Sequence, residues 1–309
     1  MASEGKIKYS ALRTPIIIMA IFWIIGIVMW QTTDGIFYLF NFRYIGTIIF
    51  IGAGLHSALP KKKKEWGRRF TQLLIGIYIL VFLGFIYYEN MQVEGFFFYL
   101  LAGFIAGSVL HYLIAKIVGP FIFSRAWCGW CCWTAMILDF LPYKRNKKGR
   151  LSTKWGNLRY VHFALSFALV LTLWFGFDYR VQSGSTAELY WLIGGNILYY
   201  VMAIPLAFIF QDNRAFCKYV CPIPAVLKVP SRFAMLKIAG DMDKCNDCGA
   251  CDKICPMDIR TTDYTKNGQR VLSTECIICD ICINVCPRGA LKYNWGFDFG
   301  KQELLNTKV

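Results

Sequence analysis

The sequence predicts a mainly α protein, in which a six-helix transmembrane bundle precedes a small cysteine-rich α+β domain. Three observations support this prediction. The chain of 309 residues has a mean hydropathy of +0.42 and 56% hydrophobic residues, which is too apolar for an ordinary soluble protein. Its apolar residues gather in six long runs. Eight of its 13 cysteines follow one spacing that occurs twice near the carboxyl end.

Each apolar run is long enough, at 1.5 Å rise per residue, to cross most or all of a hydrocarbon layer about 30 Å thick. In the fourth run, Gly103 and Gly107 form a G-x3-G pair that would let another helix approach closely. Lys116, near the end of that run, is expected to extend its amine to the membrane interface. The six expected helices are Ala11 to Gln31, Ile36 to Leu59, Thr71 to Tyr88, Gly95 to Val118, Leu158 to Phe177 and Glu188 to Phe210.

Lysine and arginine residues predict the orientation of the bundle, because positive residues are retained on the cytoplasmic side of a membrane. The segments on one side are rich in them, whereas those on the other side carry only Arg43 and Arg180. Both termini and the cysteine-rich domain are therefore expected on the cytoplasmic side of a prokaryotic cytoplasmic membrane. The basic residues on that side are Lys6, Lys8, Arg13, Lys61 to Lys64, Arg68, Arg69 and eight between Arg125 and Arg159.

The net charge of +15 does not indicate a nucleic-acid partner, because the basic residues form short blocks between apolar runs. Membrane lipid is the expected environment instead. The first apolar run, Ile16 to Trp30, is followed by further spans and by no small-residue cleavage site, so we interpret it as a retained helix and not a signal peptide.

The eight carboxyl-terminal cysteines form two copies of the pattern C-x2-C-x2-C-x3-C-P, offset by 31 residues. In this bacterial pattern three close cysteines bind one [4Fe-4S] cluster and the fourth binds the other. Zinc sites and disulfides are the alternatives, but zinc sites seldom use such a run of four cysteines. We therefore expect Cys245, Cys248, Cys251 and Cys286 to hold one cluster, and Cys276, Cys279, Cys282 and Cys255 to hold the other.

The predicted fold class is thus a six-helix transmembrane bundle with a carboxyl-terminal, bacterial-type 2[4Fe-4S] ferredoxin-like (α+β) domain. The expected divisions are a transmembrane domain over residues 1–225, a linker over 226–240, the ferredoxin domain over 241–294 and a tail over 295–309. The linker mixes apolar and basic residues, so we expect it to lie along the membrane surface.

The other five cysteines also lie near one another in the expected topology. Cys128, Cys131 and Cys132 follow the fourth span, and Cys217 and Cys221 follow the sixth. These two segments can converge, because the fifth and sixth spans form an antiparallel hairpin that returns the chain to the same face.

Two C-x3-C pairs, Cys128 with Cys132 and Cys217 with Cys221, would supply the four soft ligands that a third iron-sulfur cluster needs. The alternative is that these cysteines are ordinary buried side chains. Pairing Cys128 with Cys131 is also possible, but Cys132 reproduces the spacing of the second pair. The expected shield against water consists of Trp127, Trp130 and Trp133.

Six spans, R-x-W-C-x3-C after the fourth, C-x3-C-P after the sixth and a carboxyl-terminal two-cluster segment resemble the NapH-type membrane polyferredoxins. The resemblance covers nearly the whole chain, and extends to regulators of nitrous oxide reduction and to assembly factors of the CcoG type. It implies quinone chemistry. One departure is that the first motif ends in Cys132-Trp133, where the family normally has Cys-Pro.

The three histidines all fall in expected spans, where ionisable residues are costly and need a partner or a use. His111 and His162 are the candidate cofactor-binding residues, as hydrogen-bond partners of a quinone or as ligands of haem b, for which His56 is a further candidate. Simple bonding between helices is the alternative. Asp139 could relay protons, although a carboxylate at the inner interface is more often solvated.

These features predict a membrane-anchored electron carrier that connects the quinone pool with a partner redox protein in a multi-subunit complex. No nucleophile triad, phosphate loop or nicotinamide fingerprint is present in the sequence. The rival hypotheses are a copper-reducing assembly factor of the CcoG type and a redox-sensing membrane regulator.

Overall fold

The computed structural model describes residues 9–61, 63–105, 107–144, 149–182, 184–298 and 302–307. Lys6, Lys8, Lys62 and residues 145–148, on which the predicted orientation partly rests, lie outside the described residues. Within the described part, five helices are long and apolar enough to cross a membrane, and a shorter apolar helix covers Gly107–Phe123. The prediction of a mainly α protein with a membrane-spanning bundle is confirmed.

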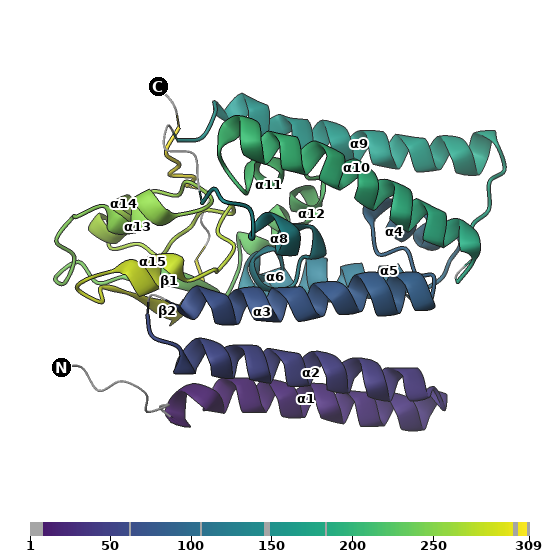
Figure 1. Cartoon of the computed structure of the whole chain (residues 1–309), viewed down its shortest axis with the longest axis horizontal. Coiled ribbons are helices and arrows are strands. Elements are labelled where there is room, and N and C mark those ends of the chain that lie inside the picture. Colours follow the sequence, from purple (N-terminus) through teal and green to yellow (C-terminus); the bar gives the residue numbers. More distant parts are fainter. Residues whose placement is uncertain are drawn as a thin grey trace.

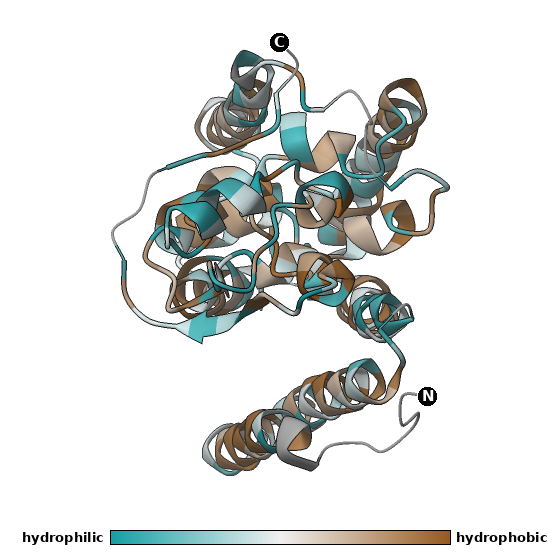
Figure 2. Ribbon diagram, turned by 90° about the vertical axis from the view of Figure 1, so that its left-hand side faces the viewer, coloured by the Kyte–Doolittle hydropathy of each residue, from teal (hydrophilic) through white to brown (hydrophobic). Residues whose placement is uncertain are grey.

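The long helices lie side by side (Figure 1), and many of their large apolar side chains are exposed. Ile17, Ile24 and Phe175 are more than half exposed, an arrangement that suits a surface facing lipid. The first two helices form a hairpin at the edge of the bundle (Figure 2). The bounds are α1 Tyr9–Thr33, α2 Ile36–Ala58, α3 Lys64–Ile77 with its continuation η1 Tyr78–Ile86, η3 Thr153–Asn157, α9 Leu158–Leu171 with its continuation η4 Thr172–Gly176, and α10 Thr186–Phe210.

The third span begins at Lys64, seven residues before the predicted start at Thr71. The added turns are helical because they bury residues on two sides. Arg68 packs against the short helices α7 (Ala126–Trp130) and α8 (Trp133–Leu138), and Gly67 packs against His56 of α2. Arg68 donates a hydrogen bond to the carbonyl oxygen of Gly129 at 2.7 Å. Arg68, which the sequence analysis used to predict the orientation of the bundle, therefore also connects the third span to the segment around Gly129.

The predicted fourth span, Gly95 to Val118, is not one helix. The chain is interrupted between α4 and α5, where Gly103 and Gly107 have φ values of +75° and +51°. This left-handed backbone ends a helix and suits glycine, so the pair breaks the span and is not a packing motif within it. The fourth crossing is made by residues 107–123. The bounds are α4 Val93–Leu101, α5 Gly107–Tyr112, η2 Leu113–Val118 and α6 Gly119–Phe123.

Residues 87–105 form a re-entrant segment, which turns back into the bundle before the fourth crossing begins. The side chain of Glu94 bonds to Ser166, near the middle of the fifth span. Farther along α4, Phe98 packs against Tyr179 and Trp191, at the end of the bundle where α10 begins. We call this the distal end. The segment thus places polar residues deep inside the bundle and then returns to the distal end.

Short helices connect the spans at the opposite end of the bundle, next to the cysteine-rich module (Figure 1). Two of them follow the fourth crossing and two follow the sixth. Because both pairs lie at the same end, the two C-x3-C motifs are brought together as the hairpin prediction required. The bounds are α7 Ala126–Trp130, α8 Trp133–Leu138, α11 Ala215–Tyr219 and α12 Ile223–Ser231.

The cysteine-rich module is built as an internal repeat with the 31-residue offset of its cysteines. Helices α13 (Ala250–Ile254) and α15 (Ile281–Val285) occupy matching positions in the two copies. The positive-φ residues also match pairwise, Asp247 with Ile278, Gly249 with Asp280 and Asp258 with Gly289. The same local backbone therefore presents the cysteines of each copy. The helix α14, Thr261–Lys266, lies between the copies in sequence.

A two-stranded antiparallel sheet closes the module and changes the predicted boundaries. Strand β1, Leu236–Gly240, pairs with β2, Leu291–Trp295, in a register that joins Leu236 to Trp295. The range 226–240, expected as an interfacial linker, therefore contains most of α12 and a strand of the module. Structurally the module begins near residue 236 and not at 241.

Residues 302–307 of the predicted tail pack back onto the module. The amide of Arg260 donates to the carbonyl oxygen of Leu304 at 2.9 Å, and the amide of Asn306 donates to that of Asp258 at 2.7 Å. The amide of Arg150 in turn donates to the carbonyl oxygen of Asn306 at 2.8 Å. The tail therefore ties the module to the loop that precedes α9.

The amino-terminal end of α1 and the cysteine-rich module lie at the same end of the bundle (Figure 1). This agrees with an even number of crossings. The side of the membrane that this end faces stays a prediction from the lysine and arginine distribution.

Candidate iron-sulfur and redox centre

Four cysteines from the two copies of the repeat surround one cavity in the module. They are Cys255, Cys276, Cys279 and Cys282, with Ile238 and Val271 among their apolar neighbours. This is the set predicted for the second cluster, with Cys255 crossing over from the first copy. The apolar lining excludes water from the sulfurs, and solvent exclusion is one of the factors that set a cluster's potential.

The other predicted set, Cys245, Cys248, Cys251 and Cys286, lies nearer the surface of the module. The thiol of Cys248 is exposed and the other three cysteines are partly buried. Backbone amides point at equivalent sulfurs in the two copies, from Ala290 to Cys286 at 3.3 Å and from Ile259 to Cys255 at 3.4 Å. Such hydrogen bonds stabilise thiolate ligands. The more exposed set is the better placed to exchange electrons with a soluble protein.

The remaining cysteine pairs meet at the end of the membrane bundle. Cys128, Cys132, Cys217 and Cys221 line a single cavity, which we call the membrane-side cavity. Cys131 does not line it and packs instead with residues of the α2 and α3 side of the bundle. The structure therefore brings together the four cysteines that the spacing argument favoured. Of the neighbours Cys131 and Cys132, it is Cys132 that lines the cavity.

The charges around the membrane-side cavity fit an anionic group such as a thiolate-bound cluster. Lys116, Arg125 and Arg214 line it, and its lining contains no carboxylate. Lys116 is fully buried with its Nζ 3.8 Å from the ring centroid of Trp127, so its amine does not reach the interface as expected. Arg125 and Arg214 also pair with the carboxylates of Glu275 and Asp139, so an anion in the cavity would chiefly compensate the buried charge of Lys116.

The sulfurs of this cavity need such a partner in order to ionise. Burial raises the pKa of Cys217 to about 12, although the nearby Arg214 opposes the shift. Burial also raises the pKa of Cys132. Without a metal these side chains remain neutral thiols, whereas metal coordination deprotonates a thiol.

The geometry around the cysteines suits a cluster better than a single zinc ion. Among the described residues, no three His, Cys, Asp or Glu side chains converge closely enough to bind one metal ion. Zinc would require four ligands within about 2.3 Å of one point. Two of the cysteine sets instead line cavities.

Of the three predicted shielding tryptophans, Trp127 and Trp133 line the membrane-side cavity. Trp130 points the other way and donates from Nε1 to the carbonyl oxygen of Ile278 at 2.8 Å. It therefore connects the first C-x3-C motif to the cysteine loop of the second copy. Gly129 touches the same loop, because a Cβ at this position would lie 2.2 Å from the carbonyl oxygen of Ile277.

Buried ion pairs surround these contacts, and the sequence analysis did not identify them. Glu275 of the module, next to Cys276, lies among four cations that come from the bundle and its connecting segments. Burial opposes its ionised form, but these cations outweigh the effect and hold the pKa of Glu275 well below its usual value. The cations and their distances to the carboxylate are Arg125 at 2.8 Å, Lys228 at 2.9 Å, Arg159 at 3.0 Å and Arg150 at 3.4 Å.

Asp139 is a second buried anion, not a solvated residue as expected. Its Oδ2 accepts hydrogen bonds from Arg214 at 2.6 Å and from Arg68 at 2.9 Å. Burial opposes ionisation, but the two arginines prevail and lower the pKa of Asp139. A structural role therefore explains this residue better than proton relay.

We expect Asp139→Asn to destabilise the bundle by about 3–5 kcal/mol, because it leaves two buried arginines without an anion. A carboxyl with a lowered folded pKa stabilises the protein above its unfolded pKa, near 4, and loses this effect as the pH falls through the folded value. The difference in thermal unfolding, followed by circular dichroism, is expected to be constant from pH 6 to 8 and to shrink below about pH 4. A constant difference down to the lowest pH would contradict this account.

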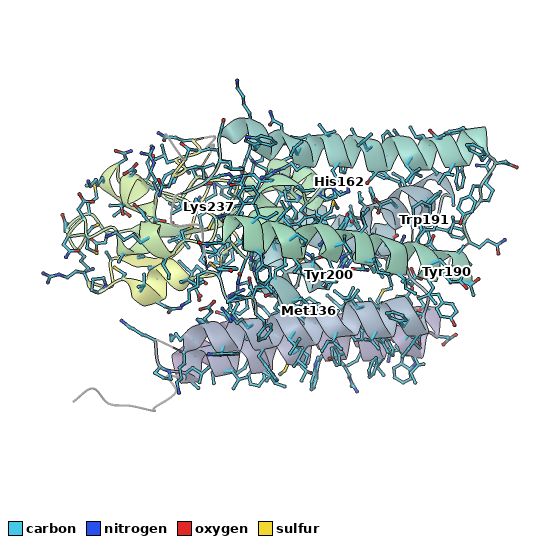
Figure 3. The ribbon with its side chains drawn as sticks, turned by 45° about the horizontal axis from the view of Figure 1, so that its top comes forward. Met136, His162, Tyr190, Trp191, Tyr200 and Lys237 are labelled. Atoms are coloured by element: carbon cyan, nitrogen blue, oxygen red, sulfur yellow. The ribbon has the colours of Figure 1, made fainter. Side chains whose placement is uncertain are left out.

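Two of the three histidines have polar partners, whereas the buried Nε2 of His111 has no hydrogen-bond partner among the described residues. His162 Nδ1 lies 3.0 Å from the carbonyl oxygen of Val220, and its ring packs against Tyr199 inside the bundle (Figure 3). His111 packs edge-on against Trp127, with ring centroids 4.7 Å apart. His56 Nε2 lies 2.8 Å from Asp280 of the module. His111 thus contacts Trp127, which lines the membrane-side cavity, and His162 contacts Val220, next to the lining residue Cys221.

Comparison with known proteins supports the iron-sulfur interpretation of both regions. A model described as "4Fe-4S dicluster domain" matches residues 237–287. A second, described as "4Fe-4S binding domain", matches residues 96–152 and 194–238, the two segments that carry the C-x3-C pairs. No solved structure matches the chain.

Relatives match over most of the chain. An uncharacterized protein of Methanocaldococcus jannaschii is 28% identical over 74% of this chain and 86% of its own length. The ferredoxin-type protein NapH of Haemophilus influenzae is 26% identical over 62% of this chain and 68% of its own length. The putative electron transport protein YccM of Escherichia coli is 28% identical over 57% of this chain and 52% of its own length. Together with the apolar helices and the two 4Fe-4S domains, these matches confirm the predicted resemblance to the NapH-type polyferredoxins and support an iron-sulfur electron-transfer protein with membrane-spanning helices.

Proposed function

We propose that this protein passes single electrons between the quinone pool and a partner redox protein through three [4Fe-4S] clusters. Two are held by the module and the third by the four cysteines of the membrane-side cavity. When bound, the clusters supply the one-electron chemistry. The observation that carries the proposal is the convergence of Cys128, Cys132, Cys217 and Cys221 on one cavity lined by three cations.

The contacts between bundle and module support a continuous route. Cys128 belongs to the same buried apolar cluster as Cys276 and Cys279, so the two sites share one packed core. The loop of residues 274–278 accepts hydrogen bonds from Trp130 and Arg125 and packs against Gly129. These residues fix the separation between the membrane-side cavity and the second cysteine set.

The protein's own residues then have defined tasks. The cysteines bind the clusters, and Trp127 and Trp133 exclude water from the membrane-side cavity. The buried cations that line this cavity compensate the negative charge of a cluster bound there. Cys248, exposed at the other end of the route, places the first cysteine set where a soluble partner can approach. The lysine and arginine distribution supports a cytoplasmic location for this end.

Iron and acid-labile sulfide in the purified protein test the number of clusters. We expect about twelve irons per chain in the native protein and about eight in Cys128→Ser and Cys217→Ser, because four irons are held by each [4Fe-4S] site. Cys131→Ser is the matched control, since Cys131 lies beside the cavity without lining it, and about twelve irons are expected. About eight irons in the native chain would overturn the third site.

Reduction by a hydroquinone analogue tests the electron donor. We expect the visible absorbance of the clusters to bleach on mixing, and to bleach less in Cys217→Ser because the entry site is lost. Reoxidation by Cu(II) with no response to hydroquinone would instead indicate a metal reductase. No rapid response to either reagent would indicate a redox sensor.

A further inference from the structure

A carboxyl group lies inside the membrane bundle, on the re-entrant segment. Glu94 is the second residue of α4, and its Oε1 accepts a hydrogen bond from Ser166 Oγ at 2.6 Å. Ser166 lies near the middle of the span Lys154–Gly176, so the carboxyl lies near the middle of the membrane. Ionisable groups at this depth are costly and usually functional.

The surroundings of Glu94 contain several buried polar atoms without a protein partner. They are Glu94 Oε2, Gln92 Nε2, Tyr112 OH and Tyr199 OH. All four residues are at least nine-tenths buried. Buried polar atoms are normally hydrogen-bonded, and a group of orphans in one region indicates a place that admits water or a ligand.

These residues connect Glu94 to the membrane-side cavity. Gln92 and Tyr199 line the cavity together with the four cysteines. Tyr112 and Tyr199 each interact electrostatically with Glu94 on one side and with the sulfurs of Cys132 and Cys221 on the other. The two tyrosines are therefore coupled electrostatically both to the carboxyl and to the cysteine site.

The chain makes room for this arrangement. A Cβ at Gly195 of α10 would lie 1.9 Å from Gln92 Oε1, so only glycine lets the Gln92 side chain pack there. Gln92 belongs to the irregular backbone before α4, and such backbone is tolerated in a membrane protein where it lines a cavity.

We propose that Glu94 is a proton-exchanging group coupled to the redox state of the membrane-side site. This inference rests on the proposed third cluster. An electron added to that site puts negative charge near Glu94, and the carboxylate then binds a proton more tightly. Glu94 would act without touching the reacting atoms, with water bridging its carboxyl to the unpartnered polar atoms of Tyr112, Tyr199 and Gln92.

Other titratable groups face the same region. Helix α5 contributes Tyr112 and His111, α9 contributes His162 next to Ser166, and α10 contributes Tyr199. The cation Lys116 comes from η2 and lines the membrane-side cavity. Of these groups, only Glu94 combines an acidic side chain with a position between the tyrosines and the interior of the bundle.

The step balances as one electron and one proton. On reduction, one electron enters the membrane-side site and one proton from water, or from the hydroxyl group of a hydroquinone, binds a Glu94 oxygen. On oxidation, the electron leaves for the module and the proton is released to water. No bond other than that O–H bond forms or breaks on the protein.

A redox titration of the full-length protein tests the proposal. The membrane-side site is identified as the signal that is lost in Cys217→Ser, and its midpoint potential is measured by EPR between pH 6 and 9. We expect the equilibrium constant for reduction to change up to tenfold per pH unit, about 59 mV for one electron. In Glu94→Gln, which keeps an acceptor for Ser166, we expect this dependence to disappear.

Redox-difference infrared spectra give an independent readout. A band of a protonated carboxyl group is expected on reduction of the native protein and is expected to be absent in Glu94→Gln. Glu188→Gln is the matched control, because Glu188 is buried in α10 near the distal end and lines no cysteine cavity. It is expected to keep both the band and the pH dependence.

The outcomes separate this inference from the proposed function. Absence of any signal that depends on Cys217 would remove the third site, and with it the basis of both. A third site whose potential is independent of pH in the native protein would overturn only the role of Glu94. So would an unchanged pH dependence in Glu94→Gln. If Glu94→Gln does not assemble, the role of Glu94 is tested by the pH dependence of the midpoint potential in the native protein and in Ser166→Ala, which removes the partner of the carboxyl.

Discussion

Replacing Glu275 by glutamine is expected to destabilise the junction of bundle and module by about 3–5 kcal/mol, because three buried arginines and the partly buried Lys228 lose their common anion. The side chains of Arg125 and Arg159 are no more than 1% exposed, so water cannot take over the role of the carboxylate. Glutamine has the same shape and keeps one acceptor oxygen. The loss of stability in Glu275→Gln would therefore result from the missing charge and not from altered packing.

Thermal loss of cluster absorbance, together with circular dichroism, measures this effect. We expect the midpoint of Glu275→Gln to fall by roughly 10 °C. Glu65→Gln is the matched control, because Glu65 pairs with Arg69 at 2.6 Å on a partly exposed helix face. Such pairs contribute about 0.3–0.5 kcal/mol, so little change is expected. Equal midpoints for the two variants would contradict the assigned role of Glu275.

Replacing Gly129 by valine is expected to separate the membrane-side site from the second cysteine set. A side chain at this position would meet the carbonyl oxygen of Ile277 at 2.2 Å, and neither backbone can move without moving Cys128 or Cys276. Overpacking of this kind costs about 1–3 kcal/mol. The bond from Trp130 to Ile278 would be strained as well. We therefore expect slower electron transfer between the two sites with an unchanged iron content.

Rapid-mixing absorbance after reduction by hydroquinone measures the transfer, and iron analysis establishes that all sites are loaded. Gly194→Ala is the matched control, because a Cβ at Gly194 would have no atom within 4 Å. Its transfer rate is expected to equal that of the native protein. A Gly129→Val variant with native transfer kinetics would show that this contact does not set the route.

The cysteine sites were largely predictable from the sequence, because ligand spacing in a cluster-binding repeat is local. Two copies of one pattern predicted two matching backbones, and the structure has them down to the left-handed residues Asp247 and Ile278. The convergence of the C-x3-C pairs followed from an even number of crossings. Their action as cluster ligands stays a prediction.

The interruption of the fourth span was not predictable from hydropathy. An average over apolar residues does not report backbone conformation, so Gly103 and Gly107 were interpreted as a packing motif although their positive φ values end the helix. The glycine pair was the available signal. Together with the polar residues Gln92 and Glu94 just before it, it could have indicated a re-entrant segment.

The buried ion pairs escaped prediction for a different reason. Arg125 and Glu275 are 150 residues apart, and Arg214 and Asp139 are 75 apart, so no local pattern joins them. The rule that cations mark the inner side of a membrane assigned every arginine to one surface role. An acidic residue beside a ligand cysteine, as in Glu275-Cys276, was the signal that a charge had to be compensated there.

The attachment of residues 302–307 has a consequence for the order in which the protein matures. The ribosome produces this segment after all 13 cysteines, whereas Arg150, which it contacts, lies in a loop that is already in place beside the membrane. Every ligand thiol is therefore translated before the last backbone bonds around Asp258 and Arg260 can close. The bonds that complete the module therefore come from a segment outside the cysteine repeat, and a chain shortened before residue 302 would lack them.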